Sequence, residues 1–231
     1  MKVLFLNPSF KGKFSRTSRS PAVTRGGTIY YPFWLAYSAG VLDRSGFEIS
    51  VIDGPAEGLS LEQTVKMACE FKPKLIVVDT STPSIYSDIE TAAILKKNIK
   101  NSFVVLVGTH PSALPAETLE INKSIDAVAK GEYDYTIRDL AFALKNNEDI
   151  KKVDGLFFRK NNEIIQNKPR QLIENIDDIP FASEVYKKYF NIKKYFFWSI
   201  RLADDYDYYR ARMPFQMLFL RLPPDISQQK L

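Results

Sequence analysis

Residues 75–84, Leu-Ile-Val-Val-Asp-Thr-Ser-Thr-Pro-Ser, decide the fold class of this chain. The run Leu75–Asp79 is apolar up to its last residue and lacks the alternation of a half-exposed strand, as is typical of a central strand in a parallel sheet. The hydroxyl-rich turn after it leads into a helical pattern over Ile85–Lys100. A buried strand followed by a helix predicts one unit of an α/β sheet with crossover helices.

The same pattern repeats on both sides of this unit. The predicted strands are Lys2–Leu6, Glu48–Ile52, Leu75–Asp79, Phe103–Val107 and Asp126–Ala129, and the predicted helices are Tyr31–Ser45, Leu61–Phe71, Ile85–Lys100, Ala116–Lys123 and Tyr135–Asn146. Ser60 is a favourable N-cap for the second helix, and Gly46 follows the end of the first. Five such units predict a Rossmann-like (flavodoxin-like), doubly wound, five-stranded parallel sheet with strand order 2-1-3-4-5.

The pattern changes after residue 148. Val153–Arg159 and Glu163–Gln166 flank a polar turn and predict a β-hairpin. Pro169–Tyr195 is first acidic and then aromatic, and is typical of a linker. We therefore expect three parts: a ligand-binding domain over 1–148, a hairpin and connector over 149–200, and a tail over 201–231.

Composition narrows the function classes. The 231 residues are 45% hydrophobic, enough for one core with an appendage, and the formal charge of +5 is scattered along the sequence. No basic stripe with interleaved aromatics is present, which argues against nucleic-acid binding. The apolar start, Lys2–Leu6, is too short for a signal sequence or a membrane span, so we expect a cytoplasmic protein.

The single cysteine, Cys69, lies on a helical pattern and is expected to be a buried, inert thiol. One thiol cannot hold an iron–sulfur cluster or a structural zinc ion, which need three or four ligands.

The loops after the five predicted strands are the candidate site, because open parallel sheets bind ligands at the carboxyl ends of their strands. These loops are small, hydroxylated or glycine-bearing, and several lead into helix N-termini. The candidate cofactor-binding residues are Asn7, Pro8, Ser9, Asp53, Thr80, Ser81, Thr82, Pro83, Gly108, Thr109, His110, Gly131, Glu132 and Tyr133. Such loops suit a large polar ligand rich in amides or phosphate.

Other functions of strand-end loops fit the sequence less well. A receiver domain needs a carboxylate pair after the first strand, where this chain has Asn7-Pro8. No G-x-G-x-x-G dinucleotide motif and no P-loop is present. His110 is the single histidine, and without a second histidine or clustered carboxylates beside it we assign no metal ligand and no catalytic residue.

These loops resemble, in order and spacing, the N-terminal half of B12-binding radical SAM proteins. The resemblance rests on Leu6-Asn7-Pro8, Tyr31-Pro32-Phe33-Trp34-Leu35-Ala36-Tyr37-Ser38-Ala39-Gly40, Val51-Ile52-Asp53-Gly54, Thr80-Ser81-Thr82-Pro83-Ser84, Leu106-Val107-Gly108-Thr109-His110-Pro111 and Ala129-Lys130-Gly131-Glu132-Tyr133-Asp134. Ile179-Pro180-Phe181 resembles that family's connector into a catalytic barrel. The similarity extends to about Ile200.

The resemblance implies a domain that holds cobalamin over the strand ends, in the base-off form and without a protein histidine below the cobalt. In complete members a C-x3-C-x2-C loop binds a [4Fe–4S] cluster that cleaves S-adenosylmethionine, and methylcobalamin often donates a methyl group. This chain has no such cysteines, so we expect a cobalamin-binding module that is catalytically incomplete without a radical SAM barrel. Trp in place of Gly108 or Ser81 is expected to weaken cobalamin binding without unfolding the sheet.

Two alternatives remain open at this stage. The chain could be a cofactor-free, flavodoxin-like regulatory or interaction domain. It could also be an active methyltransferase that takes its cluster from a partner chain.

The C-terminal part carries two further hypotheses. We expect the chain from Pro169 onward to be mobile and to self-associate through exposed aromatics, namely Tyr189, Phe196, Phe197 and Trp198, and we expect removal of everything after Asn167 to give a better-behaved monomer. Tyr195 belongs to the same aromatic cluster. We also expect residues 201–231 to be a frameshift product. Read one nucleotide later, the codons of Met213, Met217 and Leu220 can each supply a cysteine, which restores the C-x3-C-x2-C spacing.

Overall fold

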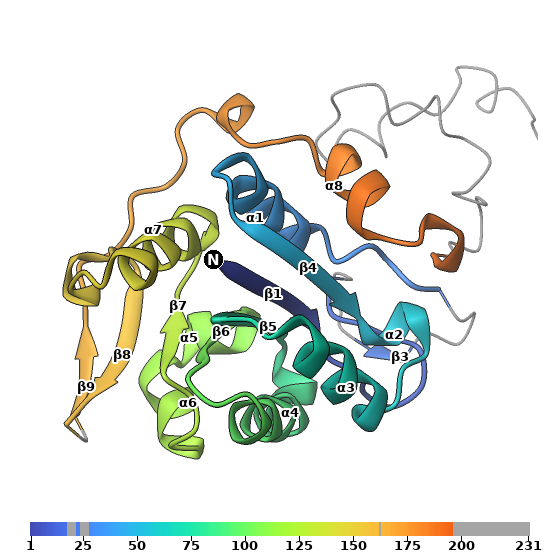
Figure 1. Ribbon diagram of the computed structural model, residues 1–231, viewed down its shortest axis with the longest axis horizontal. Coiled ribbons are helices and arrows are strands. Elements are labelled where there is room, and N and C mark those ends of the chain that lie inside the picture. The colour runs from blue at the N-terminus through green and yellow to red at the C-terminus, as the bar shows by residue number, and fades with distance from the viewer. Residues whose placement is uncertain (18–21, 24–27, 162, 196–231) are drawn as a thin grey trace, which may run out of the picture.

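A seven-stranded sheet forms the centre of the structure, a computed structural model that describes residues 1–17, 22–23, 28–161 and 163–195 (Figure 1). The strands are β1 (Lys2–Asn7), β4 (Glu48–Asp53), β5 (Leu75–Thr80), β6 (Phe103–Gly108), β7 (Ala127–Ala129), β8 (Leu156–Lys160) and β9 (Glu163–Gln166), in the order β4-β1-β5-β6-β7-β8-β9. The first five in this order run parallel. The Rossmann-like fold and the predicted strand order 2-1-3-4-5 are confirmed.

Helices cover both faces of the sheet (Figure 1). One face carries α1 (Phe33–Arg44) and α7 (Asp134–Asn146), with α8 (Ala182–Tyr189) packed on α1; the other carries α3 (Leu61–Phe71), α4 (Ile85–Asn98) and α6 (Pro115–Ile121). The shorter elements are α2 (Gly54–Glu57), α5 (Thr109–Ala113), the 3₁₀ turns Thr82–Ser84, Ile150–Lys152, Ile176–Asp178 and Ile192–Lys194, and a two-stranded ribbon of β2 (Phe14–Ser15) and β3 (Ala22–Val23).

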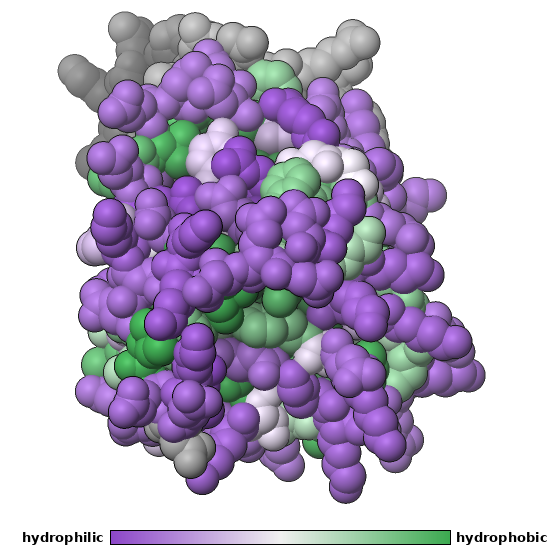
Figure 2. Space-filling model, turned by 60° about the vertical axis from the view of Figure 1, so that its left-hand side comes forward, coloured by the Kyte–Doolittle hydropathy of each residue, from purple (hydrophilic) through white to green (hydrophobic). Residues whose placement is uncertain are grey.

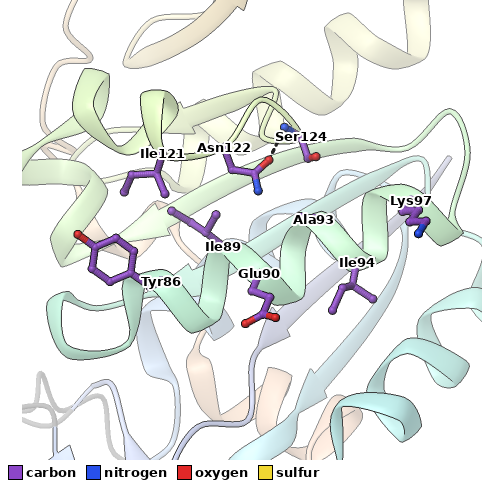
Figure 3. A pocket seen from close by; sticks show the side chains of 9 residues that line it. All are labelled: Tyr86, Ile89, Glu90, Ala93, Ile94, Lys97, Ile121, Asn122 and Ser124. Carbon is purple, nitrogen blue, oxygen red and sulfur yellow. Dashed lines mark hydrogen bonds between the residues drawn. The ribbon is translucent and has the colours of Figure 1, made fainter.

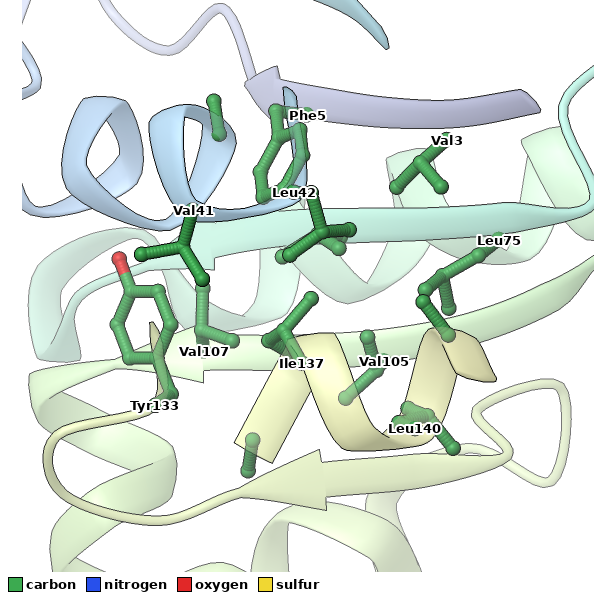
Figure 4. Packing of buried hydrophobic residues seen from close by; sticks show 14 of the residues in the cluster. Val3, Phe5, Val41, Leu42, Leu75, Val105, Val107, Tyr133, Ile137 and Leu140 are labelled. Carbon is green, nitrogen blue, oxygen red and sulfur yellow. The ribbon is translucent and has the colours of Figure 1, made fainter. Parts of the chain in front are cut away.

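The core has two layers because successive residues of a strand face opposite sides. In β1, Val3 and Phe5 pack under α1 and α7, whereas Leu4 and Leu6 pack toward α4. All four side chains are fully buried. Figure 4 shows the first layer, with Val41 and Leu42 of α1 beside strand residues. The central strands are thus apolar on both faces, as the sequence indicates.

Helix α3 begins where the sequence predicts. Ser60 Oγ accepts from the backbone N–H of Gln63 at 3.1 Å, and Gln63 Oε1 accepts from the N–H of Ser60 at 2.8 Å. This reciprocal capping box satisfies two backbone donors that would otherwise have no partner within the helix. The short helices α2 and α5 follow β4 and β6 directly and were not predicted.

The predicted hairpin is part of the main sheet. β8 pairs antiparallel with β7, with Ala127 opposite Phe158, and β9 pairs with β8. Leu156 and Phe158 are buried in the layer under α7. The hairpin therefore extends the five parallel strands to seven, because its apolar residues complete that layer.

The connector (residues 167–195) packs on the domain, so the expectation that its Tyr189 finds no partner within the chain is wrong. Val185 of α8 is 3% exposed and belongs to the core layer under α1. Tyr189 donates to Asp43 at the end of α1, and Tyr195 is 4% exposed. The amphipathic pattern of α8 explains this packing. Phe196, Phe197 and Trp198 lie outside the described residues.

The described surface is mostly polar. The face in Figure 2 is largely hydrophilic, with its hydrophobic residues in small separate groups. Cys69 is half-buried on α3 as a free thiol, rather than fully buried as expected. Within the described residues, no helix is both long and apolar enough to cross a membrane.

Candidate functional site

Three strands end in polar residues on one face of the sheet. Asn7 of β1 pairs with Asp53 of β4, and Asp79 lies at the corresponding end of β5, one position after the last paired residues of β1 and β5. Residues two positions earlier, such as Phe5, face α1 and α7, and residues two apart on a strand share a face. Asn7, Asp53 and Asp79 are each 4% exposed. They form a buried polar row at the carboxyl end of the sheet.

Arg16 connects the end of β1 to α4. Its Nη1 donates to Oδ1 of Asn7 at 2.7 Å and to the carbonyl of Pro8 at 2.6 Å, and its guanidinium pairs with Asp88 of α4 through Nε and Nη2. The side chains of Arg16 and Asp88 are 1% and 0% exposed. Ser84 Oγ also donates to Asp88, at 2.6 Å. Part of the long loop predicted over Ser9–Thr28 is therefore a structural element of the site.

Tyr195 joins this network from the connector. Its hydroxyl donates to Oδ2 of Asp53 at 2.5 Å, while Asn7 Nδ2 donates to Oδ1 of Asp53 at 2.8 Å. Oδ1 of Asp53 also accepts from the N–H of Ala56 at 3.3 Å and so caps α2. Burial raises the pKa of Asp53 to about 6, although Tyr195, Ala56, Asn7 and Arg16 each lower it. Every oxygen of Asp53 thus has a partner inside the protein.

The ends of β5 and β6 approach each other closely at Gly108. Its φ is +113°, and a Cβ there would lie 2.1 Å from the carbonyl oxygen of Thr80. Thr80 Oγ1 donates to the carbonyl of Val107 at 2.8 Å, and Ser81 Oγ lies 2.8 Å from Ser84 Oγ. Any side chain at position 108 would therefore clash with the Thr80 backbone and strain the backbone of residue 108 itself.

The exposed part of the site is a rim built by the loops after β5, β6 and β7. Nδ1 of the half-exposed His110 lies 3.4 Å from Thr82 Oγ1. Ser112 Oγ accepts from the N–H of Gly131 at 3.0 Å and donates to the carbonyl of Gly108 at 2.7 Å. Ser112 therefore connects the loop after β6 to the loop after β7. The exposed or half-exposed rim residues are Thr82, Pro83, Thr109, His110, Gly131 and Glu132.

Four buried polar atoms near this edge have no hydrogen-bond partner among the described residues. They are Oδ2 of Asp79, the hydroxyl of Tyr133, Oδ1 of Asp134 and Oγ of Ser38. The nearby charges of Asp79 and Asp134 add to burial in raising the pKa of Tyr133, so these three groups share one neighbourhood. Figure 4 shows the Tyr133 ring beside Val41 and Val107. Buried polar atoms are nearly always paired, so this cluster indicates a place for a hydrogen-bonding ligand.

Burial also governs the carboxyl groups of this cluster. It raises the pKa of Asp79 to about 7, with Arg16 lowering it and the Asp88 and Asp53 charges raising it further. Burial likewise raises the pKa of Asp134 to about 7. Near neutral pH each carboxyl can therefore hold a proton and donate a hydrogen bond, or lose it and accept one.

A surface hollow lies along α4, outside the polar row. It has a volume of about 490 Å³. Figure 3 shows its lining between α4 and the chain after α6: Tyr86, Ile89, Glu90, Ala93, Ile94, Lys97, Ile121, Asn122 and Ser124. A smaller hollow of about 130 Å³ is lined by Ser9, Leu61, Thr64, Ser87, Glu90 and Thr91. Of the predicted site residues, Ser9 alone lines either one.

The structure brings the five predicted loops to one edge of the sheet but gives their residues different roles. Asn7, Asp53, Thr80 and Ser81 are buried and bonded within the protein, Pro8 offers its carbonyl to Arg16, and Ser9 Oγ donates to the carbonyl of Leu59 at 2.6 Å. The sequence alone did not predict that the site would include Arg16, Asp79, Asp88, Asp134 and Tyr195. In the described residues, no group of three histidine, cysteine or carboxylate side chains could hold a metal ion.

A family model, described as the B12 binding domain, matches residues 19–141, which is more than half of the chain. The chain is 33% identical over 184 residues to an uncharacterized methyltransferase of Pyrococcus horikoshii, covering 79% of this chain and 38% of that protein. It is 26% identical over 205 residues to the anaerobic magnesium-protoporphyrin IX monomethyl ester cyclase of Synechocystis sp., covering 88% and 39%. The chain spans about two fifths of the length of these two relatives.

Solved structures support the fold. The cobalamin-dependent S-adenosylmethionine radical enzyme OxsB, with aqua-cobalamin and S-adenosylmethionine bound, matches with a TM-score of 0.65 and 17% identity over 80% of this chain and 25% of that one. The radical S-adenosylmethionine methyltransferase TsrM from Kitasatospora setae, with cobalamin and a [4Fe-4S] cluster bound, matches with a TM-score of 0.59 and 19% identity over 78% and 30%. None of these matches supports the cofactor-free alternative. The fold, the strand-end site and the family model agree: this chain belongs to the B12-binding domain family.

Proposed function

We propose that this chain binds cobalamin at the carboxyl ends of β5, β6 and β7, as the cofactor domain of a B12-dependent radical SAM protein. The observation that carries the proposal is the cluster of unpaired, buried polar atoms at that edge in a chain of the B12-binding family. Both named structural neighbours were solved with a corrinoid bound.

The available groups fit such a ligand. Cobalamin carries many amide side chains and a phosphate-linked nucleotide, so it needs both donors and acceptors. Thr82 and Thr109 offer exposed hydroxyl groups on the rim, and the buried carboxyl groups of Asp79 and Asp134 can donate or accept near neutral pH. The hydroxyl of Tyr133 adds a further donor. We infer that these residues hold the polar periphery of the ligand.

The ends of β1 and β4 play a supporting role in this proposal. The polar groups of Asn7 and Asp53 are already engaged by Arg16 and Tyr195, and displacing Arg16 would leave the buried Asp88 without its counter-charge. Such a buried, unpaired charge is costly. Asn7, Pro8, Ser9 and Asp53 therefore shape the edge, and the direct contacts fall on the side of β5 to β7.

His110 is proposed to contact the periphery of the ligand and to leave the cobalt free. It stands on the rim beside Thr82, half-exposed, and among the described residues no carboxylate hydrogen-bonds its ring. This agrees with the base-off form, without a histidine below the cobalt, that the family resemblance implies.

When bound as methylcobalamin, the cofactor can supply a methyl group. We propose that the reaction itself belongs to a radical SAM domain with its own [4Fe–4S] cluster and S-adenosylmethionine, which is a partner of this domain. The relative from Pyrococcus horikoshii that is named a methyltransferase supports methyl transfer as the chemistry of the parent protein. A cytoplasmic location is part of the same proposal, since Cys69 is a free thiol of the kind that a reducing compartment maintains. Cell fractionation tests the location.

Hydroxocobalamin titration with rim variants tests the binding site. Gly108→Trp and Ser81→Trp are unsuitable, because position 108 touches the Thr80 backbone and Ser81 is buried. Thr109→Trp instead adds bulk at an exposed rim position, and Glu70→Trp adds the same bulk at the exposed end of α3, on the opposite edge of the sheet. We expect Thr109→Trp to lower affinity at least about tenfold and Glu70→Trp to leave it unchanged. Equal affinities of the two variants would place the site elsewhere.

A further inference from the structure

Tyr195 connects the connector to the polar row at the strand ends. Its hydroxyl donates to Asp53 Oδ2 at 2.5 Å, and its ring is 4% exposed. Around it, Ile29 of the loop after β1 and Ala56 of α2 form a small separate core cluster with it. This bond between a buried tyrosine hydroxyl and a buried carboxylate is a specific contact, because its loss would leave a buried polar oxygen without that partner.

The ring of Tyr195 also fixes the loop that follows β1. Tyr31, near the end of that loop, stacks on Tyr195 with ring centroids 4.0 Å apart and on Tyr186 of α8 with centroids 4.2 Å apart. The carbonyl of Tyr31 accepts from Thr17 Oγ1 at 2.8 Å. Thr17 follows Arg16, which binds Asn7 at the end of β1 and Asp88 of α4. The connector and the site are thus joined by consecutive direct contacts.

A second contact holds the connector at the C-terminal end of α8 itself. The hydroxyl of Tyr189 donates to Asp43 at 2.8 Å, and Lys188 Nζ pairs with the same carboxylate at 2.8 Å. Asp43 lies in the last turn of α1. Tyr189 and Tyr195 therefore make the same kind of bond, one distant from the strand-end site and one within its polar row.

We propose that Tyr195 is a positioning residue that couples the connector to the ligand-binding edge. Through Asp53 and Tyr31 it holds the loop after β1 in place, and it fixes the point from which the chain continues relative to that edge. Ligand binding at this edge and the position of the connector then depend on each other. The ligand part of this inference rests on the proposed function; the coupling within the protein does not.

The first test compares Tyr195→Phe with the matched control Tyr189→Phe in the full chain without ligand. Each variant loses one tyrosine hydroxyl that donates to an aspartate and keeps its ring. Hydrogen exchange is measured on backbone amides of Phe14–Thr17 and Thr28–Tyr31. We expect exchange about tenfold faster in Tyr195→Phe than in the wild type, as suits the loss of a hydrogen bond to a charged group, and wild-type exchange in Tyr189→Phe. Equal exchange in the two variants overturns the coupling.

The pH dependence of hydrogen-exchange protection in the loop after β1 distinguishes this positioning role of Tyr195 from a general loss of stability. The groups around Asp53 are the side chains of Arg16 and Asn7 on the β1 side, the carboxyl of Asp79 in β5, the N–H of Ala56 in α2 and the hydroxyl of Tyr195. The charge of Glu57 in α2 acts on Tyr195. The bond from Tyr195 lowers the pKa of Asp53, so its loss moves that titration to higher pH. Burial raises the pKa of Asp53 above its ordinary value, so opening of the loop releases a proton, and loop protection should fall as the pH rises through about 6 in the wild type and Tyr189→Phe, and the fall should extend to higher pH in Tyr195→Phe. An unshifted profile in Tyr195→Phe contradicts the proposal.

The last arm adds hydroxocobalamin. We expect ligand to slow exchange in the connector amides of Tyr186–Tyr195 in the wild type and Tyr189→Phe, and to do so at least about threefold less in Tyr195→Phe. If the wild type binds no cobalamin, the proposed function fails, and the ligand-free exchange alone then decides the coupling. If all three proteins bind and respond equally, the coupling is refuted while the binding site stands.

Discussion

At the residue scale, the site depends on buried charges that are mutually compensated. Arg16 is the cation beside Asp88, and it lowers the pKa of Asp79 and Asp53 as well. Removing one partner of a buried ion pair typically costs about 3–5 kcal/mol, because a charge is left without compensation, whereas exposed pairs contribute about 0–1 kcal/mol. The structure therefore distinguishes the buried ion pair of Arg16 and Asp88 from exposed ion pairs such as that of Lys2 and Glu48, which the sequence alone does not.

We predict that Arg16→Met lowers the free energy of unfolding by about 3 kcal/mol or more. The control is Lys2→Met, because Lys2 pairs with Glu48 at 3.3 Å with both side chains largely exposed, and it should cost less than about 1 kcal/mol. Urea unfolding of both variants measures the difference. Similar losses in the two variants would show that Arg16 is not buried as described.

The raised pKa of Asp79 makes stability depend on pH in a definite direction. The pKa is about 7 in the folded protein against 3.8 as the ordinary value, so the folded state keeps its proton where the unfolded state has lost it. This contribution is fully present below about pH 4 and is lost as the pH rises toward 7. Between pH 5 and pH 8 the change amounts to about 2–3 kcal/mol. Asp79→Asn removes it.

Unfolding at pH 5 and pH 8 checks this. The wild type should lose more stability on going to pH 8 than Asp79→Asn does, and the variant should be the more stable of the two at pH 8. Parallel losses in the two proteins would mean that Asp79 ionises normally in the folded state.

The residues at this edge that were predicted from the sequence differ physically from those that were not. Rim residues such as Thr82 and Thr109 were found because they follow strands, and the carboxyl ends of parallel strands share an edge. Arg16 and Tyr195 were missed because their partners, Asp88 and Asp53, lie 72 and 142 positions away. Local pattern predicts which edge carries the site, whereas pairings over such distances depend on how the loops fold back.

At the element scale, periodicity predicted the long helices and the parallel strands, and tertiary packing decided the rest. Ser60 marked the start of α3 because capping is a local interaction. The hairpin was predicted from its own pattern, but its pairing with β7 required Leu156 and Phe158 to be buried under α7. α8 was assigned to a linker because its eight residues stand within an acidic and aromatic segment, although their own pattern is amphipathic.

The packing of α8 reverses the expected effect of truncation. A chain ending after Asn167 was expected to behave better than the full chain. It would lack Val185 and Tyr195, which are 3% and 4% exposed. Burial of side chains of this size contributes about 1.5–3 kcal/mol each. We predict that a chain of residues 1–167 is less stable than a chain of residues 1–195 by at least about 3 kcal/mol.

Thermal unfolding and size-exclusion chromatography of the two truncated chains check this. The shorter chain should also associate more, because removing α8 uncovers apolar residues of α1. A more stable, monomeric 1–167 chain would contradict the packing of the connector. Association of the full chain through Phe196, Phe197 and Trp198 remains a prediction that comparison with 1–195 tests.

At the scale of the whole molecule, the family model defines a B12-binding domain, and the radical chemistry proposed for the parent protein requires a cluster that the one cysteine of this chain cannot hold. The frameshift hypothesis concerns residues 201–231, outside the described residues. We predict that the gene, read one nucleotide later over codons 213–221, encodes three cysteines with C-x3-C-x2-C spacing. Sequencing the gene settles this, and a stop codon soon after codon 220 in that frame, or missing cysteine codons, would end the hypothesis.

The central claim is that cobalamin binds at the carboxyl ends of β5, β6 and β7. Isothermal titration of the full chain with hydroxocobalamin, beside Thr109→Trp and Glu70→Trp, tests it most directly. We expect one hydroxocobalamin site in the wild type, affinity lowered at least about tenfold in Thr109→Trp, and unchanged affinity in Glu70→Trp. No binding by the wild type, or equal affinity in all three proteins, would contradict it.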